Sequence, residues 1–348
     1  MTSDLKSHGL RGPVKSCTEE TAHPMMAPTG GSSQLLFNRT ILYDRNGRIV
    51  TLRVHNSDGS EWAIHHEYSS SGQLLKISSG TAGSAPSITT HSYDEQGRLQ
   101  QITTDDGKPP TSFRYDERGR KTASHVSRAE DYRPNVASSG SPFEVSDGPP
   151  NLPDGGTATT IYDDHDRPTE VQVRDASGDL VSRAVRAYDA AGRIVEEKQI
   201  SEDVMAGFPV AVQKQMVEMH GLPADQVRRE LQSQLAKMMG GSLETYTITY
   251  TYDSLGRIRH VSRRIYNHQD EIDTTYNDHG DAESEITRGT RLDPPNDPAA
   301  ATSSYSEVRN SYRYDEHGNW TERTASYRST AVSEFQTSTV VKRSLTYY

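Results

Sequence analysis

Apolar and polar residues alternate in short runs along most of the chain. In the run 245–252, an aromatic or aliphatic residue occupies every second position and threonine occupies the positions between them. Runs that end at Tyr68, Tyr115 and Tyr314 show related spacing. Successive side chains of a β-strand point to opposite faces, and β-branched and aromatic residues favour strands. The pattern therefore predicts strands with one apolar and one polar face, each ending at an inward tyrosine.

A six-residue motif, Tyr-Asp-x-x-Gly-Arg, follows the alternating runs in five strict copies. Repetition of this kind indicates units that stack edge to edge and share a core. The signature residues, which we interpret as structural, are Tyr43, Asp44, Gly47, Arg48, Tyr93, Asp94, Gly97, Arg98, Tyr115, Asp116, Gly119, Arg120, Tyr188, Asp189, Gly192, Arg193, Tyr252, Asp253, Gly256 and Arg257.

Four weaker copies start at Tyr68, Tyr162, Tyr276 and Tyr314. The copy at Tyr68 keeps only the tyrosine and the glycine. In the others, Asp166 stands for glycine, Asn277 stands for aspartate, and Asn319 follows the last glycine. Several steps between tyrosines lie near 25 residues, as from Tyr43 to Tyr68. The long step from Tyr188 to Tyr252 predicts an insertion.

The motif has the composition of a tight turn. Its aspartate can accept backbone N–H groups two residues further on, and its glycine can adopt the positive φ that a bulged type I turn requires. The arginine begins the return strand and can reach back to the aspartate or over a neighbouring tyrosine. A second turn type, as at 56–59, 104–107 and 175–178, separates the motifs. The sequence thus predicts an all-β fold of repeated antiparallel hairpins in one meander.

Residues 203–240 break the β-pattern. Val227, Leu231, Leu235 and Met238 recur at helical spacing, and a shorter helix is expected before Gly221. We therefore predict a helical hairpin insert at 203–240 between sheet regions 1–202 and 241–348, with surface loops at 133–157 and 289–304. The apolar stripe of the insert either packs on the sheet or forms a flap that binds a partner, because methionine surfaces adapt to many ligands.

Composition excludes several classes of function. The net charge of −10, with arginines spread along the chain, disfavours binding of nucleic acid. No apolar run is long enough to span a membrane, and the polar residues 1–9 contain no secretory signal. Cys17 is the only cysteine, so no internal disulfide is possible, and we expect a buried, unreactive thiol.

Candidate chemistry is sparse, and we predict no catalytic, cofactor-binding or metal-binding residue. His65 and His66 are adjacent on a strand and point to opposite faces. The histidines in motif turns, which we expect to be exposed, are His165, His279 and His317. Asp163, Asp164 and Asp166 form the densest acidic cluster but lack the spacing and final glutamate of a calcium loop, so turn capping is the preferred interpretation. No carboxylate pair stands out for glycoside hydrolysis.

With its five strict motifs, the chain resembles the YD-repeat or Rhs-repeat proteins of bacteria, whose relatives include toxin-complex shells and teneurins. The resemblance covers about residues 35–325 and implies hairpins that coil into a curled or spiral sheet, which can enclose a hollow. It also implies export or display at the cell surface. Shell-forming members are longer and end in a self-cleaving aspartate segment followed by a toxin, to which 293–298 is only superficially similar.

Three functions follow from these observations and the resemblance. The first is a non-catalytic scaffold, on the cell surface or secreted, that binds a protein or glycan; exposed aromatic side chains such as Trp62 and Trp320 could stack on sugars. The second is an accessory or fragment of an Rhs-type toxin system that encloses or docks a peptide. The third is a glycosidase. The sequence does not fix the ligand or the oligomeric state.

Overall fold

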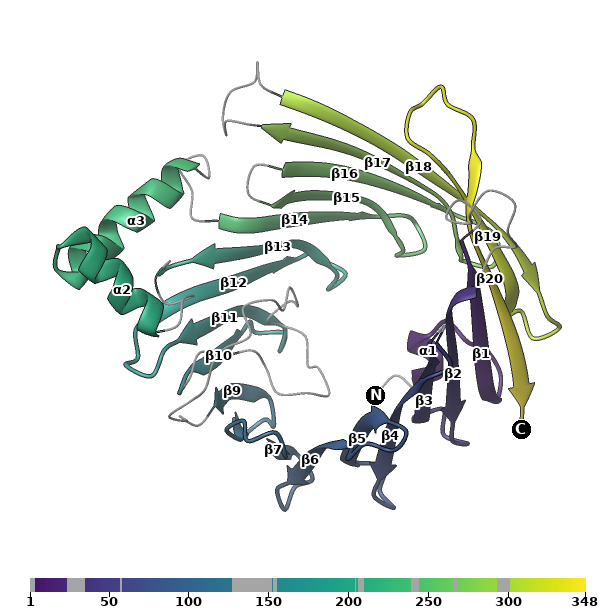
Figure 1. The fold of residues 1–348 in the computed structure, drawn as a ribbon, viewed down its shortest axis with the longest axis horizontal. Coiled ribbons are helices and arrows are strands. Elements are labelled where there is room, and N and C mark those ends of the chain that lie inside the picture. The colour runs from purple at the N-terminus through teal and green to yellow at the C-terminus, as the bar shows by residue number, and fades with distance from the viewer. Residues whose placement is uncertain are drawn as a thin grey trace. The chain divides into compact units, whose positions relative to one another are not determined.

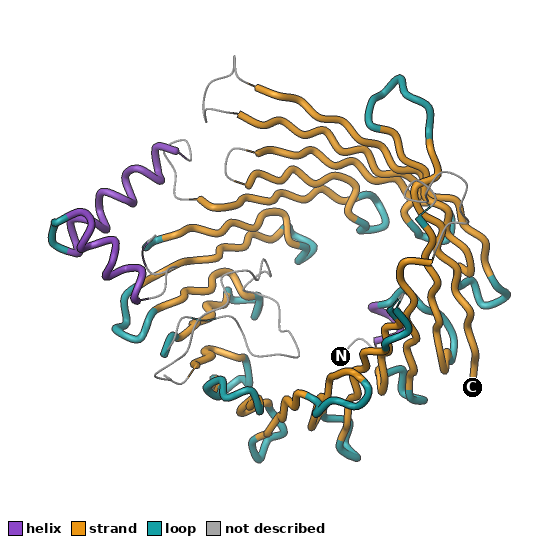
Figure 2. Tube along the Cα trace, viewed as in Figure 1, coloured by secondary structure: helices purple, strands orange, loops and turns teal. Residues whose placement is uncertain are grey.

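The computed structural model describes residues 4–23, 35–56, 58–126, 152, 155–203, 205, 210–238, 244–265, 268–292 and 301–348. Most of these residues form β-strands joined by short turns (Figures 1 and 2). The prediction of an all-β fold built from antiparallel hairpins is therefore confirmed. The expected loop at 133–157 falls largely outside the described residues. The expected loop at 289–304 is too long, because residues 289–292 and 301–304 continue strands, and 293–300 lie outside the described residues.

The chain forms two compact units. The first contains Met1–Thr90, Asp273–Thr287 and Ser304–Tyr348, and the second contains His91–Ile272 and Arg288–Ser303. In each unit, strands that follow one another in the sequence pair in antiparallel register, as short turns require.

The first unit includes one short helix and ten strands that lie wholly or mainly within it. They are α1 (Asp4–Ser7), β1 (Val14–Ala22), β2 (Leu35–Tyr43), β3 (Ile49–His55), β4 (Glu61–Tyr68), β5 (Leu74–Thr81), β6 (Ser87–Tyr93), β17 (Ala282–Leu292), β18 (Ala301–Tyr314), β19 (Trp320–Arg328) and β20 (Gln336–Tyr347).

The second unit includes the two helices of the insert and the remaining strands. They are β7 (Leu99–Thr104), β8 (Thr111–Tyr115), β9 (Lys121–Val126), β10 (Thr157–Tyr162), β11 (Pro168–Arg174), β12 (Leu180–Tyr188), β13 (Ile194–Ser201), α2 (Val210–His220), α3 (Ala224–Met238), β14 (Glu244–Tyr252), β15 (Ile258–Ile265) and β16 (His268–Tyr276).

Strand β1 lies between β2 and β20, so the first and last strands of the chain are neighbours (Figure 1). Cys17 faces Ile41 on one side and Leu345 on the other. The expectation of a curled or spiral sheet is wrong on this point, because a spiral leaves its first and last strands as separate free edges. Alternation along a strand identifies its two faces, but it does not say which strand covers each edge.

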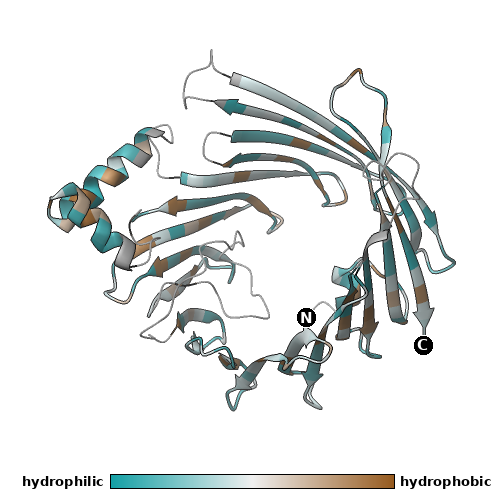
Figure 3. Cartoon of the chain, viewed as in Figure 1, coloured by the Kyte–Doolittle hydropathy of each residue, from teal (hydrophilic) through white to brown (hydrophobic). Residues whose placement is uncertain are grey.

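Apolar side chains are spread along the strands in small groups (Figure 3). In the first unit, the buried residues of one cluster are Leu5, Leu10, Val14, Cys17, Ile41 and Tyr43. In the second unit, Val126, Leu152, Ala158 and Val171 form another. Because each hairpin contributes only a few such side chains, burial depends on contact with neighbouring hairpins.

The insert forms two helices, α2 and α3, which lie beyond the ends of β12 and β13 (Figure 1). Val227 of α3 is completely buried, and Met205 is nearly so. Arg228 Nε lies 3.0 Å from Asp203 Oδ2, and Gln232 Nε2 donates to the carbonyl of Glu202 at 2.6 Å. These contacts fasten α3 to the segment that follows β13.

Candidate functional site

The first strict motif shows how its residues build a turn. Asp44 Oδ1 accepts the backbone N–H groups of Asn46 at 2.9 Å and Arg48 at 3.0 Å. Its Oδ2 accepts Arg48 Nε at 2.7 Å. Gly47, at φ 77°, donates its N–H to the carbonyl of Asp44. A side chain at this φ would be strained, so glycine has a conformational reason to occupy the position.

The other strict motifs repeat this network. Their Asp Oδ2 to Arg Nε distances are 2.7 Å for Asp94 and Arg98, 2.6 Å for Asp116 and Arg120, 2.8 Å for Asp189 and Arg193, and 2.7 Å for Asp253 and Arg257. The copy at Asp163 and Arg167 keeps the bond at 2.7 Å. There Asp166 replaces glycine at φ 60°, which aspartate tolerates better than most residues.

A second set of contacts joins each motif to the next one. The guanidinium carbon of Arg48 lies 4.5 Å from the ring centroid of Tyr68, and the Tyr68 hydroxyl donates to the carbonyl of Ile49 at 2.9 Å. Equivalent arginine-to-ring distances are 4.9 Å for Arg98 and Tyr115, 4.8 Å for Arg120 and Tyr162, 4.8 Å for Arg167 and Tyr188, and 4.5 Å for Arg193 and Tyr252. We call this series of contacts the arginine–tyrosine ladder.

The turn carboxylates are acidic because they accept several N–H groups. For Asp163, the hydrogen bond from Arg167 is the largest cause, and it outweighs desolvation to lower the pKa to about 2. For Asp189, backbone and side-chain bonds from Arg193 lower the pKa. The carboxylates are thus ionised acceptors within their own turns. Since proton transfer at neutral pH needs a pKa near 7, they are poorly matched to that role.

Two copies that lack the final arginine use histidine in the ladder. In the copy 276–281, the ring of His279 stacks on Tyr314 with centroids 3.8 Å apart. In the copy 314–319, His317 stacks on Tyr347 at 4.1 Å. The tyrosine hydroxyls donate to acidic side chains, Tyr314 to Asp281 and Tyr347 to Asp315. A planar cationic or aromatic group therefore covers the next tyrosine in both arrangements.

Buried carboxylates form a further group that the sequence analysis missed. Glu19 of β1 is 6% exposed and binds Arg39 of β2 and Arg343 of β20. Arg343 in turn lies 3.4 Å from the ring centroid of Trp320. Trp320 is thus covered by an arginine and is not an open platform for sugars. Glu19 is two positions from Cys17, so the charged residue on an otherwise apolar face was the available signal.

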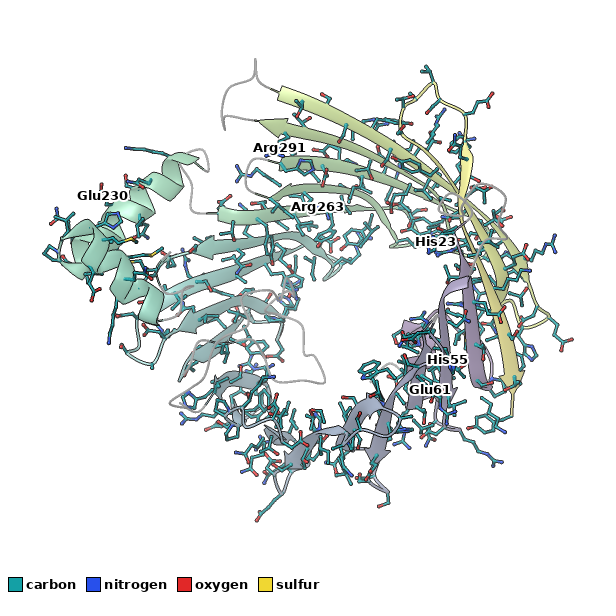
Figure 4. The ribbon with its side chains drawn as sticks, viewed as in Figure 1. His23, His55, Glu61, Glu230, Arg263 and Arg291 are labelled. Carbon is teal, nitrogen blue, oxygen red and sulfur yellow. The ribbon has the colours of Figure 1, made fainter. Side chains whose placement is uncertain are left out.

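Similar clusters occur elsewhere in the sheet. Glu307 is 3% exposed and accepts bonds from Tyr305, Arg309 and Arg328. In the second unit, Glu197 is 5% exposed and binds Arg186. Charged side chains of neighbouring strands also lie close together elsewhere, as do His55 of β3 and Glu61 of β4, whose Nδ1 and Oε2 atoms are 3.3 Å apart (Figure 4). Such pairs specify register between strands, because removal of one partner leaves a buried charge.

The remaining sequence candidates lie apart from one another. Burial raises the pKa of the Cys17 thiol to about 11, as expected of an unreactive cysteine. His65 contacts Thr51, whereas His66 stacks on Tyr68, so the two side chains lie on opposite faces of β4. Trp62 is 36% exposed, so part of its ring faces solvent. The three histidines in motif turns are exposed: His165, His279 and His317.

Two open depressions lie in the second unit. One, of about 320 Å³, is on strands β13–β16 and is lined by Lys198, Glu244, Thr247, Thr249, Ser262, Arg264 and Gln269. The other, of about 280 Å³, lies at the helical hairpin and is lined by Met205, Gln213, Lys214, Val217, Glu218, Ala224 and Arg228. The first is polar and the second is mainly apolar.

Within the described part of the chain, no three histidine, cysteine, aspartate or glutamate residues are grouped to hold a metal ion. None of the described helices has the length and apolar character needed to cross a membrane.

Comparison with known proteins identifies one family. The family model described as Teneurin YD-shell matches residues 48–341. No relative was found among curated proteins. Two solved structures are similar at low level, both porin-like proteins with 10% identity: one from Bacteroides uniformis (97% of this chain, 98% of that chain, TM-score 0.34) and one from Bacteroides vulgatus (96%, 98%, TM-score 0.28).

Proposed function

We propose, from the premise that this chain belongs to the Teneurin YD-shell family, that it is a non-catalytic repeat scaffold. We further propose that the scaffold is displayed at the cell surface or secreted, and that it binds a protein or a glycan. The family match covers the same motifs that build the arginine–tyrosine ladder. Function is therefore expected to reside in surfaces that the ladder supports.

One observation carries the proposal: the distinctive residues are engaged with one another. The motif aspartate bonds its own turn, the motif arginine bonds that aspartate, and the next tyrosine lies under the guanidinium, as in Asp44, Arg48 and Tyr68. The same arrangement recurs along the chain, whereas an active site is one irregular and well-supported cluster. This favours a structural role for the signature residues.

The polar depression on β13–β16 is the best candidate for contact with a glycan. Lys198 and Arg264 lie on either side of Thr247, since both residues are its register partners. Hydroxyl groups of Thr249 and Ser262 line the same depression. Hydroxyl and cationic groups on a rigid sheet suit a ligand rich in hydroxyl or acidic groups.

A glycan array probed with the purified chain tests this proposal. We expect binding that falls at least tenfold in a Lys198→Ala, Arg264→Ala double variant and is unchanged in Arg229→Ala, a change at a helix residue whose side chain is 71% exposed. Glycan binding that is unchanged in the Lys198→Ala, Arg264→Ala double variant would show that this depression is not the binding site. A panel of chromogenic glycosides tests the non-catalytic assignment, and hydrolysis abolished by one carboxylate substitution would overturn it.

The docking of a peptide, as in an accessory of a toxin system, is the second candidate. One observation favours it: in the first unit, motif turns already hold a segment of the chain, residues 10–13, by its backbone and one arginine side chain. A glycosidase role has no comparable support from the described residues.

A further inference from the structure

In several copies, the arginine of one motif covers both the tyrosine and the glycine of the next. Arg48 stacks on Tyr68, and its Nη1 lies 2.8 Å from the point where a Cβ on Gly72 would be. Arg193 stacks on Tyr252 and lies similarly near Gly256, at 3.8 Å. In these copies, a guanidinium group from the preceding motif thus lies over the glycine, whereas in the strict copy 115–120 no atom lies within 4 Å of the point where a Cβ on Gly119 would be.

The copy 276–281 lacks this arginine, because Asp281 occupies its position. The guanidinium above the next glycine, Gly318, comes instead from Arg11. Its Nη1 lies 2.9 Å from the point where a Cβ on Gly318 would be, and its Nη2 donates to the carbonyl of His279 at 2.6 Å. Arg11 thus takes the place of a missing motif arginine, although it is distant in sequence.

The copy 314–319 holds the backbone of the same residue. Asn319, which stands where arginine would be, is 1% exposed. Its Oδ1 accepts the N–H of Arg11 at 2.7 Å, and its Nδ2 donates to the carbonyl of Arg11 at 2.9 Å. An arginine at 319 could not accept the first of these bonds. The amide is therefore matched to the backbone N–H and carbonyl of a single residue.

The next residue of the segment fits closely beneath a histidine. Gly12 has φ 74°, and a Cβ there would lie 3.2 Å from His317 Cδ2 and 3.8 Å from Tyr347 Cε1. A residue with a side chain at position 12 would be strained and crowded. On either side of this contact, Leu10 and Val14 are buried in the core of the first unit.

We propose that the two degenerate motifs, 276–281 and 314–319, form a binding site for a bent Leu-Arg-Gly-Pro segment, and that residues 10–13 of this chain are its resident ligand. The site recognises one guanidinium group through the His279 carbonyl and the surface of Gly318, and one backbone amide pair through Asn319. The departures of these copies from the repeat signature, Asp281 and Asn319, define the ligand class.

Chemical rescue in the full chain tests the guanidinium-binding part of this site, which consists of the His279 carbonyl and the surface of Gly318 and which we call the guanidinium socket. We expect Arg11→Ala to raise amide hydrogen exchange at 315–319 by roughly tenfold or more, since a hydrogen bond to a charged group contributes about 1.5–3 kcal/mol. Ethylguanidinium at millimolar concentration should restore protection, and ethylammonium at the same concentration should not. Arg313→Ala, at a residue whose side chain is 79% exposed, is the matched control and should leave exchange unchanged.

Two outcomes would overturn the proposal: exchange that is unaffected in Arg11→Ala, or equal rescue by the ammonium and the guanidinium compounds. Arg11→Lys provides a second measurement in case the alanine variant fails to fold. Lysine keeps the charge but not the planar fork of donors. We expect exchange at 315–319 to rise in this variant too, and protection equal to that of the unmodified chain would show that charge alone is sufficient, against the proposed site.

A coupling experiment separates replacement of a motif arginine from simple attachment of the N-terminal segment. Asp281→Arg restores the motif arginine, whose guanidinium would compete with that of Arg11 for the surface of Gly318. We expect Arg11→Ala to raise exchange at 315–319 several-fold less in the Asp281→Arg background than in the unmodified chain. Equal effects in the two backgrounds would contradict a shared socket.

Discussion

The guanidinium of Arg193 lies over the ring of Tyr252, 4.5 Å from its centroid, although the helical insert separates the two residues in sequence. The Tyr252 hydroxyl also donates to the carbonyl of Ile194, 58 positions earlier, as Tyr68 does to Ile49 over 19 positions. The ladder therefore has the same geometry with and without an insertion. The insert leaves the sheet between β13 and β14, whose register places Ile200 opposite Glu244.

Removal of the insert should leave the sheet folded. We expect a variant in which Asn-Gly replaces residues 202–242 to unfold cooperatively, with a melting temperature within a few degrees of the parent, because a two-residue turn can join antiparallel strands. Circular dichroism measures the transition. The same deletion combined with Arg193→Ala is the control, and it should be less stable by about 1–2 kcal/mol. A deletion variant without a cooperative transition would show that α2 and α3 are needed by the sheet.

The motif aspartate should tolerate asparagine better than alanine. Asn277 already occupies this position in one copy, and its Oδ1 accepts the N–H groups of His279 at 2.9 Å and Asp281 at 3.0 Å. Asp44→Asn should keep the backbone bonds and lose the ionic bond to Arg48, which should lower the free energy of unfolding by about 1 kcal/mol. Asp44→Ala should lose the backbone bonds as well as the ionic bond, which should lower the free energy of unfolding by about 2–3 kcal/mol. Urea denaturation measures the difference, and equal losses would mean that the backbone bonds contribute little.

Much of the local structure could be predicted from the sequence, because it is set by neighbours in the chain. The turn at Asp44 and Gly47 depends on an acceptor and a positive φ within five residues, and the alternation before Tyr252 fixes the strand faces. The helices of the insert follow from the spacing of residues such as Val227.

Contacts between distant segments could not be predicted in the same way. Nothing near Arg11 indicates that it covers Gly318, and nothing in β1 indicates that β20 pairs with it, because both facts depend on how the strands are ordered in space. The degenerate copies were visible as exceptions, but their role required the position of the N-terminal segment. The role of Glu19 could not be predicted either, because its partners Arg39 and Arg343 lie on two other strands, β2 and β20.

Neutralisation of a buried glutamate should be strongly destabilising. Glu307 is 3% exposed and accepts bonds from Tyr305, Arg309 and Arg328. We expect Glu307→Gln to lower the free energy of unfolding by about 1.5–3 kcal/mol, because Arg328, whose side chain is 19% exposed, loses its ionic partner. Chemical denaturation provides the measurement.

A matched control for this prediction is Glu316→Gln. The Glu316 side chain is 88% exposed, so its neutralisation should change the free energy of unfolding by no more than about 0.5 kcal/mol. If the two variants were equally stable, the ion pairs around Glu307 would not contribute to the stability of the fold.

The hydrogen bond between Tyr347 and Asp315 should make stability fall at alkaline pH. Desolvation and the bond to the Asp315 carboxylate raise the pKa of Tyr347 to about 12, against an ordinary value of 10.0. The neutral phenol is thus favoured in the folded state. Its contribution is fully present below pH 10 and is lost as the pH rises from about 10 to 12.

Tyr347→Phe should remove this part of the pH dependence. We expect the variant to be less stable than the parent at neutral pH by about 1 kcal/mol, and the difference to shrink as the pH rises through 10 to 12. Tyr348→Phe is the control, because Tyr348 is 48% exposed and its hydroxyl donates to the carbonyl of Tyr43, which carries no charge. Thermal melts at a series of pH values measure both variants. A constant difference between Tyr347→Phe and the parent across this range would show that ionisation of Tyr347 is not linked to unfolding, and that the bond to Asp315 does not hold the phenol neutral.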